Sequence, residues 1–278
     1  MFKSESTTSL SIEDDENNPS SLQAGFIYPM PKKDGIGIEN FLKAKVVLIT
    51  GSTGFLAKVL VEKILRSMPY VRKIYLLIRG EDMEDARQRV KNEGNYEAFM
   101  WSTLVPVVGD VGHSTLGIQE DLAVKISKDV QIIVNIAGDT AFYLRYDVAL
   151  QVNAMRPCNL LNFASMCKNI ELFVHTSTIS VKRYTREGRF VEEKQCLSPR
   201  DSMGRQVRVM SETTVLENEM KEKEYGWYNT YVFTKALGEM LIDSMRSKIS
   251  VPIVIVRPSG VLSTYKEPYP VWIEEHSD

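Results

Sequence analysis

A repeated alternation of short apolar segments with amphipathic segments constrains the fold of this 278-residue chain most strongly. Six segments rich in Val, Ile and Leu have the length of buried strands: 45–50, 73–78, 104–108, 129–137, 171–177 and 251–257. Segments with a helical spacing of apolar residues lie between them, at 55–67, 81–92, 145–168 and 232–247. Because buried strands joined by helices are typical of a parallel sheet covered on both faces, the sequence predicts an α/β fold with a doubly wound parallel sheet of the Rossmann type.

Composition separates a tail from this domain. Residues 1–34 are polar and acidic, are rich in Ser, Asn and Pro, and show no sustained period. Such a segment cannot bury enough apolar surface to fold, so we expect a disordered tail at 1–34 and one dinucleotide-binding domain at 35–278. The formal net charge of −2 provides no general attraction to nucleic acid, and we expect no nucleic-acid partner.

The sequence shows no segment that would cross a membrane. No apolar run approaches the roughly 18 residues that a spanning helix needs, and the N-terminus has no apolar secretory core. We therefore expect an intracellular protein, with the plastid and the cytosol or surface of the endoplasmic reticulum as alternatives. The histidines lie far apart and the cysteines form no CxxC pair, so we expect no metal site and reduced thiols at Cys158, Cys167 and Cys196. His175 lies in an apolar strand and is expected to belong to the core or to support the site.

A glycine-containing turn, T-G-S-T-G-F-L-A, follows the first predicted strand directly. Gly51 suits a tight turn, Gly54 lets the backbone approach a phosphate, and Ala57 lets the helix pack closely on the strand. The free N–H groups and positive dipole end of the following helix would then face an anion. This pattern predicts a dinucleotide-binding loop, with a plain strand-to-helix turn as the alternative.

The end of the second predicted strand indicates which dinucleotide is bound. An acidic residue there would bind the ribose 2′-hydroxyl of NAD, but this strand ends in Arg79-Gly80, and Glu81 and Asp82 come later. A guanidinium suits a 2′-phosphate through charge-assisted hydrogen bonds. Arg79 therefore predicts NADPH as the cofactor, with a solvated arginine as the alternative.

Tyr231 and Lys235 lie one helical turn apart at the start of a predicted amphipathic helix. The spacing alone is weak, since Tyr28 and Lys32 share it with prolines between them that exclude a helix. A free phenol has a pKa of about 10, too high for an efficient acid at neutral pH, and we expect the nearby ammonium to lower the pKa of Tyr231.

A hydroxyl that orients a substrate carbonyl is expected at the end of the strand at 171–177. That strand delivers Thr176, Ser177 and Thr178 at its carboxyl end, where open α/β sheets bind ligands. Simple capping by Ser and Thr is the alternative.

These motifs together resemble the extended short-chain dehydrogenase/reductases, and more closely the plant fatty acyl-CoA reductases of the male-sterility type. The resembling stretches are GIGIENFLKAKVVLITGSTGFLAKVLVEKILR, RYDVALQVNA, HTSTISV, YGWYNTYVFTKALGEM and VIVRPSGVLSTYKEPYPVWIE. They cover residues 35–278 with gaps. The most specific parts are the phosphate loop that continues as FLAK and the ending RPS…STYKEP.

The resemblance implies site residues by position. It places the catalytic Ser/Thr-Tyr-Lys triad on Thr178, Tyr231 and Lys235, with Ser177 as a neighbour, and it implies that Asn153 supports the lysine through water. Besides Arg79, Tyr231 and Lys235, the cofactor-binding residues are expected to be Gly51, Thr53, Gly54, Phe55, Leu56, Asp110, Asn135, Ala137 and Pro258.

The resemblance also implies a reaction, the NADPH-dependent reduction of a fatty acyl thioester to a primary alcohol through the aldehyde. The acyl group would be carried on CoA or on an acyl-carrier protein. Two alternatives stay open: a nucleotide-sugar epimerase or dehydratase on the same fold, and a protein that binds the dinucleotide without turnover.

Several departures from the family pattern set further expectations. Lys182-Arg183 and Val271 stand where the family has Gly, the stretch between Arg89 and Val105 is short, and the chain stops at Asp278 where family members continue. We therefore expect an incomplete substrate region, weak activity with poor selectivity for chain length, and apolar surface exposed near the open edge of the sheet. Such a surface predicts self-association or peripheral contact with a membrane.

Overall fold

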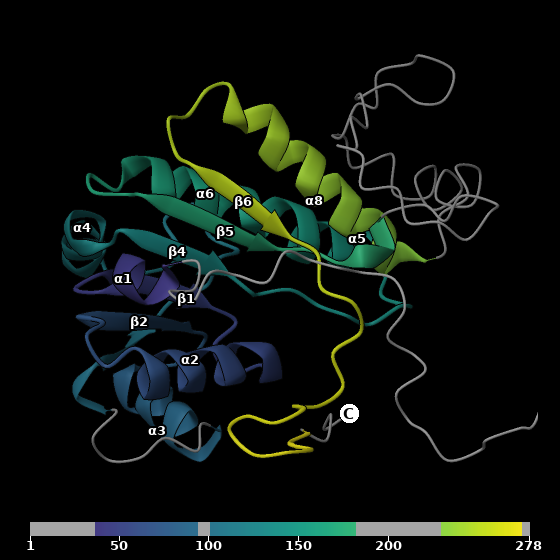
Figure 1. Cartoon of the computed structure of the whole chain (residues 1–278). Coiled ribbons are helices and arrows are strands. Elements are labelled where there is room, and N and C mark those ends of the chain that lie inside the picture. The colour runs from purple at the N-terminus through teal and green to yellow at the C-terminus, as the bar shows by residue number, and fades with distance from the viewer. Residues whose placement is uncertain (1–36, 94–100, 182–228, 274–278) are drawn as a thin grey trace, which may run out of the picture. The chain divides into compact units, whose positions relative to one another are not determined.

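The computed structural model of this protein describes residues 37–93, 101–181 and 229–273 (Figure 1). From Glu39 onward the chain forms one compact unit. Its centre is a parallel sheet in the order β3-β2-β1-β4-β5-β6. The strands are β1 (Val46–Thr50), β2 (Lys73–Ile78), β3 (Leu104–Val108), β4 (Ile132–Asn135), β5 (Leu172–Thr176) and β6 (Ile253–Val256). The predicted doubly wound α/β fold is confirmed.

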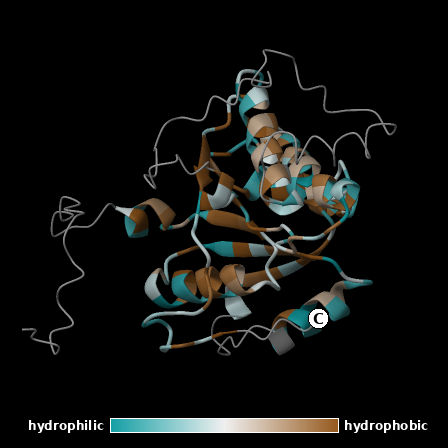
Figure 2. Ribbon diagram, turned by 90° about the vertical axis from the view of Figure 1, so that its right-hand side faces the viewer, coloured by the Kyte–Doolittle hydropathy of each residue, from teal (hydrophilic) through white to brown (hydrophobic). Residues whose placement is uncertain are grey.

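Helices cover both faces of the sheet, as Figure 1 shows. One face packs against α2 (Phe55–Ser67) and α3 (Met83–Glu93) through an apolar cluster that includes Val47, Ile49 and Val61. The other face packs against α4 (Glu120–Asp129), α6 (Arg156–Met166) and α8 (Thr230–Arg246). A short helix, α1 (Ile38–Leu42), precedes β1. The strands between these layers are largely hydrophobic (Figure 2), which explains their continuous apolar runs in the sequence.

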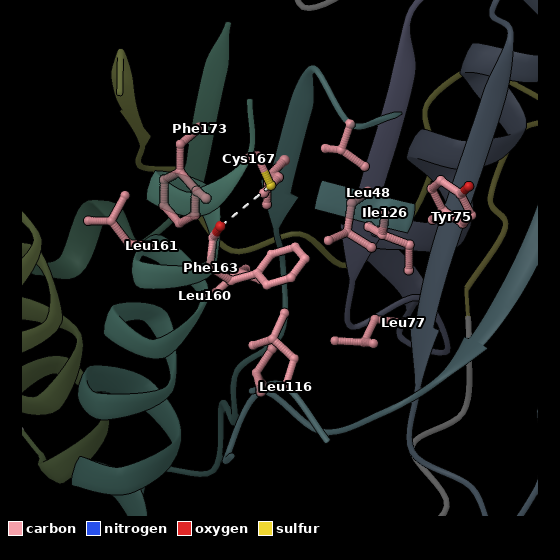
Figure 3. Packing of buried hydrophobic residues seen from close by; sticks show 14 of the residues in the cluster. Leu48, Tyr75, Leu77, Leu116, Ile126, Leu160, Leu161, Phe163, Cys167 and Phe173 are labelled. Carbon is pink, nitrogen blue, oxygen red and sulfur yellow. Dashed lines mark hydrogen bonds between the residues drawn. The ribbon is translucent and has the colours of Figure 1, made fainter. Parts of the chain in front are cut away.

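The larger core cluster lies between the sheet and α4, α6 and α8. Leu48 and Phe173 point from the strands into it, and Leu160 and Leu161 enter it from α6 (Figure 3). Cys167 lies in the same cluster, where its thiol donates to the carbonyl oxygen of Phe163 at 3.4 Å. Burial raises the pKa of this thiol to about 12, so it is a poor nucleophile.

The helix expected at 145–168 is divided. It consists of α5 (Tyr146–Leu150), a π-helical turn η2 (Gln151–Met155), and α6. Pro157 explains the irregularity, because it has no N–H to donate to the carbonyl of Asn153 four residues earlier. That carbonyl lies against α8, where a Cβ placed on Gly238 would come within 2.4 Å of it. The missing side chain of Gly238 thus lets α8 and η2 approach closely.

Other elements differ in detail from the expected ones. The helix α4 and the short 3-10 helix η3 (Ile179–Val181) were not expected, and β4 is shorter than the apolar run at 129–137. Among the described residues, no helix combines the length and the apolar character needed to cross a bilayer.

Candidate functional site

The predicted site residues gather at the carboxyl ends of the strands. Gly51 follows β1, Ala137 follows β4, and Thr178 follows β5. The sheet order reverses its direction of winding between β1 and β4, and a ligand crevice is expected at such a switch point. A surface hollow near Gln131 and Glu171 lies at the opposite ends of the strands and includes none of the predicted site residues.

The glycine turn has the geometry of a phosphate cradle. Gly51 has a φ of 68°, and a Cβ at this position would lie 2.6 Å from the backbone nitrogen of Ala137. Only glycine suits such a conformation and such a close approach. Gly54 is the N-cap of α2 and provides no side-chain cap, so the first N–H groups of α2, at Phe55 and Leu56, have no side-chain partner at the cap. The turn therefore fits the pyrophosphate of a dinucleotide.

A row of buried polar side chains crosses three strands beneath this turn. The hydroxyl of Thr50 donates to Asn135 at 2.7 Å and accepts from the backbone N–H of Ala137 at 3.3 Å. The amide nitrogen of Asn135 lies 3.0 Å from Nδ1 of His175. Since the amide oxygen of Asn135 accepts from Thr50, its nitrogen donates to His175, whose proton then sits on Nε2. His175 thus contacts a predicted cofactor-binding residue, and its supporting role, one of the two expected from the sequence, stays a prediction.

His175 is held neutral in this row. Burial, and to a smaller extent the charge of Lys235, lowers the pKa of His175 to about 3. In the part of the chain that the structure describes, Nε2 of His175 and the hydroxyl of Ser177 are buried without a hydrogen-bond partner. The two groups lie two residues apart at the end of β5, and Ser177 continues the ladder through its N–H to Val256. Phe173, two residues before His175, points to the face that α8 covers, so His175 and Ser177 lie on that face as well.

The structure brings together the three residues of the predicted triad. A hydrogen bond joins the side chains of Tyr231 and Thr178, and the ammonium of Lys235 donates to the carbonyl oxygen of Thr176 at 2.8 Å. Asn229 caps α8 by accepting from the N–H of Val232, which sets the start of the helix that carries Tyr231.

The charge states within this group differ from the expected ones. Burial raises the pKa of Tyr231, against the smaller opposite effect of its hydrogen bond to Thr178. The expected lowering by Lys235 is wrong for this arrangement, because the ammonium is directed at a backbone carbonyl instead. Burial lowers the pKa of Lys235 to about 8, although the carboxylate of Glu239 partly opposes the shift.

Asn153 holds the loop after β4 against α8. Its side chain accepts from the N–H of Asp139 at 3.0 Å and donates to the carbonyl of Asp139 at 3.1 Å and the hydroxyl of Thr234 at 3.3 Å. A Cβ on Gly138 would lie 3.3 Å from both Asn153 Oδ1 and Lys235 Nζ. The structure therefore places Asn153 close to the lysine that it is expected to support through water, and that support stays a prediction.

Arg79 and Asp110 lie apart from the triad, at the ends of β2 and β3. Arg79 is exposed, and its guanidinium makes no ion pair with any residue that the structure describes. The nearby carboxylates are engaged by backbone N–H groups at the start of α3: Asp82 accepts from Glu84 and Asp85, and Asp85 accepts from Glu81. Arg79 is thus an exposed charge at the end of β2, and the guanidinium of Arg89 lies beside it, where it donates to the carbonyl oxygen of Arg79.

The remaining predicted cofactor residues line the same edge. Asp110 accepts from the N–H of Gly112 at 2.7 Å and lies 3.7 Å from the guanidinium of Arg156. The carbonyl of Pro258 accepts from the N–H of Ile179 at 2.9 Å, which places the RPS motif beside Thr178. Thr53 lies half-buried in the phosphate turn. No cluster of metal-binding side chains occurs within residues 37–93, 101–181 and 229–273.

An ion pair that the sequence analysis missed lies next to the triad. The guanidinium of Arg257 donates to both carboxylate oxygens of Glu239, with distances of 2.9 and 3.1 Å from Nε. Glu239 follows Lys235 by one helical turn, so the pair ties the end of β6 to the helix that carries the triad. The sequence contained a hint of this pair, because an acidic residue four positions after Lys235 lies on the same face of the helix as the lysine.

Comparison with known proteins is consistent with this geometry. The model of a family described as male sterility protein matches residues 49–277. Fatty acyl-CoA reductase 2, chloroplastic, of Arabidopsis thaliana is 42% identical, over 87% of this chain and 46% of that protein. The alcohol-forming fatty acyl-CoA reductase of Simmondsia chinensis is 34% identical, over 85% of this chain and 55% of that protein. The chain spans about half the length of the curated relatives it matches.

Solved structures share the fold at low sequence identity. The terminal R domain of the myxalamid PKS-NRPS pathway superposes with a TM-score of 0.62 at 21% identity, over 80% of this chain and 50% of that one. The yeast methylglyoxal/isovaleraldehyde reductase Gre2, solved as a complex with NADPH, gives a TM-score of 0.52 at 16% identity, over 78% of this chain and 58% of that one. These similarities concern the fold alone.

Proposed function

This chain belongs to the male sterility protein family, and from that premise we propose that it takes part in the NADPH-dependent reduction of a fatty acyl thioester to a primary alcohol through the aldehyde. The observation that carries the proposal is the meeting of Thr178, Tyr231 and Lys235 beside the glycine turn. A proton donor and a cofactor cradle at one edge of the sheet are what a carbonyl reduction needs.

The residues of the triad would share the work as follows. Tyr231 and Thr178 donate hydrogen bonds to the thioester oxygen and stabilise the negative charge that develops on it. The phenol of Tyr231 is protonated at neutral pH, and burial raises its pKa further, so the proton stays on the hydroxyl until the substrate oxygen becomes basic. The ammonium of Lys235 would bind the hydroxyls of the nicotinamide ribose. A bound NADPH supplies the hydride.

The proposal includes the choice of cofactor and of substrate carrier. The exposed guanidinium of Arg79 makes no ion pair with the described residues and lies beside carboxylates that α3 already engages, which supports NADPH over NADH. CoA and acyl-carrier protein stay equal candidates as carriers, because both present a thioester. The name of the Arabidopsis thaliana relative supports the plastid as the compartment.

The test is product analysis by gas chromatography after incubation of the protein with palmitoyl-CoA and NADPH. We expect hexadecanol as the product. Tyr231→Phe should abolish the product while leaving NADPH affinity nearly unchanged, because only the proton donor is lost. Product formation by Tyr231→Phe at most of the original rate would contradict the assignment of the triad. NADPH binding without product in the unmodified protein would favour the alternative of a dinucleotide-binding protein without turnover.

A further inference from the structure

The segment that follows β6 spans the candidate cofactor site, and we call residues 257–272 the strap. In Figure 1 this segment, drawn in yellow, leaves the end of β6 and runs toward the sheet half that α2 covers. It contains the STYKEP motif, to which the proposed reaction assigns no role. Its two ends contact the two halves of the site.

The first end of the strap is joined to the triad. Arg257 is paired with Glu239, one turn beyond the predicted catalytic lysine on α8. The carbonyl of Pro258 accepts from the N–H of Ile179, which directly follows the predicted catalytic threonine. This end is thereby held against both elements that carry catalytic side chains.

The far part of the strap is closed into a loop by one buried hydroxyl. Thr264 donates to the carbonyl of Tyr269 at 2.7 Å and accepts from the N–H of Trp272 at 3.0 Å. The backbone N–H of Thr264 donates to the carbonyl oxygen of Trp272 at 3.1 Å, and the carbonyl oxygen of Thr264 accepts from the N–H of Val271 at 2.9 Å. Val271 has a φ of 61°, which a β-branched residue rarely adopts. The bonds to Thr264 on either side hold this strained conformation in place.

The closed loop is docked on α2. Glu267 is paired with Lys63 and with Arg66, whose guanidinium lies 2.9 Å from the carboxylate. The ring of Trp272 meets that of Phe55 edge-on, with centroids 5.5 Å apart and an angle of 86° between the planes. The ion pairs are exposed and contribute little, so the aromatic contact and the Thr264 bonds are the ones to test.

Phe55 is the residue of α2 that the ring of Trp272 contacts. It is the first residue of α2, immediately after the cap residue Gly54, at the turn that fits a pyrophosphate. We propose that the strap sets the position of this turn relative to the triad helix, which makes Trp272 a positioning residue for the dinucleotide. The inference rests on the proposed function only in assuming that a dinucleotide binds.

The experiment measures the Kd of NADPH by isothermal titration calorimetry. Trp272→Ala removes the contact with Phe55, and Thr264→Val removes the hydroxyl that closes the loop. The matched control is Tyr265→Ala, because this ring lies in the same loop but is 84% exposed. We expect the first two variants to weaken binding by about threefold to tenfold, and the control by less than about twofold.

A second variant separates the ring contact from general damage. Trp272→Phe keeps an aromatic ring opposite Phe55 and should retain most of the affinity. Hydrogen exchange without NADPH gives an independent readout, since Trp272→Ala should speed exchange at the first turn of α2. Equal affinity in Trp272→Ala and the unmodified protein, with unchanged exchange at that turn, would overturn the inference while the proposed function stands. Failure of the unmodified protein to bind any dinucleotide would instead overturn both.

Discussion

At the scale of single residues, the exposed charge of Arg79 should determine the choice of dinucleotide. Since nearby carboxylates are engaged by the start of α3, we expect NADPH to bind at least about tenfold more tightly than NADH, or about 1.4 kcal/mol. Arg79→Ala should remove most of that preference and leave NADH affinity unchanged. Arg87→Ala, an exposed arginine on α3, is the matched control. Equal Kd values for the two cofactors in the unmodified protein would show that Arg79 does not bind the 2′-phosphate.

Lys235 illustrates the cost of a functional charge. Burial lowers its pKa to about 8, below the 10.5 of an exposed lysine, so the unfolded state binds the proton more tightly. The free energy of unfolding should therefore rise with pH from about 8 toward 10.5, and the full penalty should apply below pH 8. Lys235→Met should stabilise the protein at pH 7 by on the order of 1 kcal/mol and remove the rise with pH, because it relieves the burial of a charge.

Urea unfolding at pH 7 and pH 9 checks this expectation. A less stable Lys235→Met at pH 7 would mean that the hydrogen bond to the carbonyl of Thr176 outweighs the desolvation of the ammonium.

At the scale of secondary-structure elements, the contact between α8 and the π-helical turn η2 should be sensitive to one added methyl group. A Cβ at Gly238 would lie 2.4 Å from the carbonyl oxygen of Asn153, and backbone on both sides leaves no flexible group to move. Gly238→Ala should lower the free energy of unfolding by about 1–3 kcal/mol through overpacking. It should also weaken NADPH binding, because α8 carries Tyr231 and Lys235.

Gly260→Ala is the matched control for that substitution. Nothing lies within 4 Å of a Cβ placed there. The free energy of unfolding of this variant, measured by thermal denaturation, should therefore stay within a few tenths of a kcal/mol of that of the unmodified protein. A fully stable Gly238→Ala would show that α8 can shift away from η2 without cost.

At the scale of the whole molecule, the outer face of β6 should drive self-association. Val254 and Val256 are 45% and 44% exposed on β6, the last strand of the sheet that the described residues form, while Ile253 and Ile255 pack on the core. In sedimentation experiments we expect the unmodified protein to be a mixture of monomer and oligomer. The double variant Val254→Lys/Val256→Glu should be monomeric. Val124→Lys on α4, which replaces a similarly exposed valine, should have no effect. A monomer at high concentration before substitution would exclude this surface as an interface.

The sequence by itself determined the six strands, most of the long helices and the type of site. Residues 55–67, 73–78 and 104–108 were predicted with the bounds that the structure has, because apolar periodicity and glycine turns are local properties of the chain. The glycine turn, Arg79 and the Tyr231–Lys235 spacing also carried the prediction of a dinucleotide site from a few neighbouring residues.

Only the tertiary structure decided how those residues are charged and held. The pKa of Tyr231 is raised instead of lowered, since burial and the direction of the Lys235 ammonium depend on packing between β5 and α8. The contact of Trp272 with Phe55 likewise joins residues far apart in the sequence, which no local pattern reveals. The period of apolar residues indicates which side of a helix or strand is buried. The electrostatic field at a buried group depends instead on the groups that the fold places opposite it.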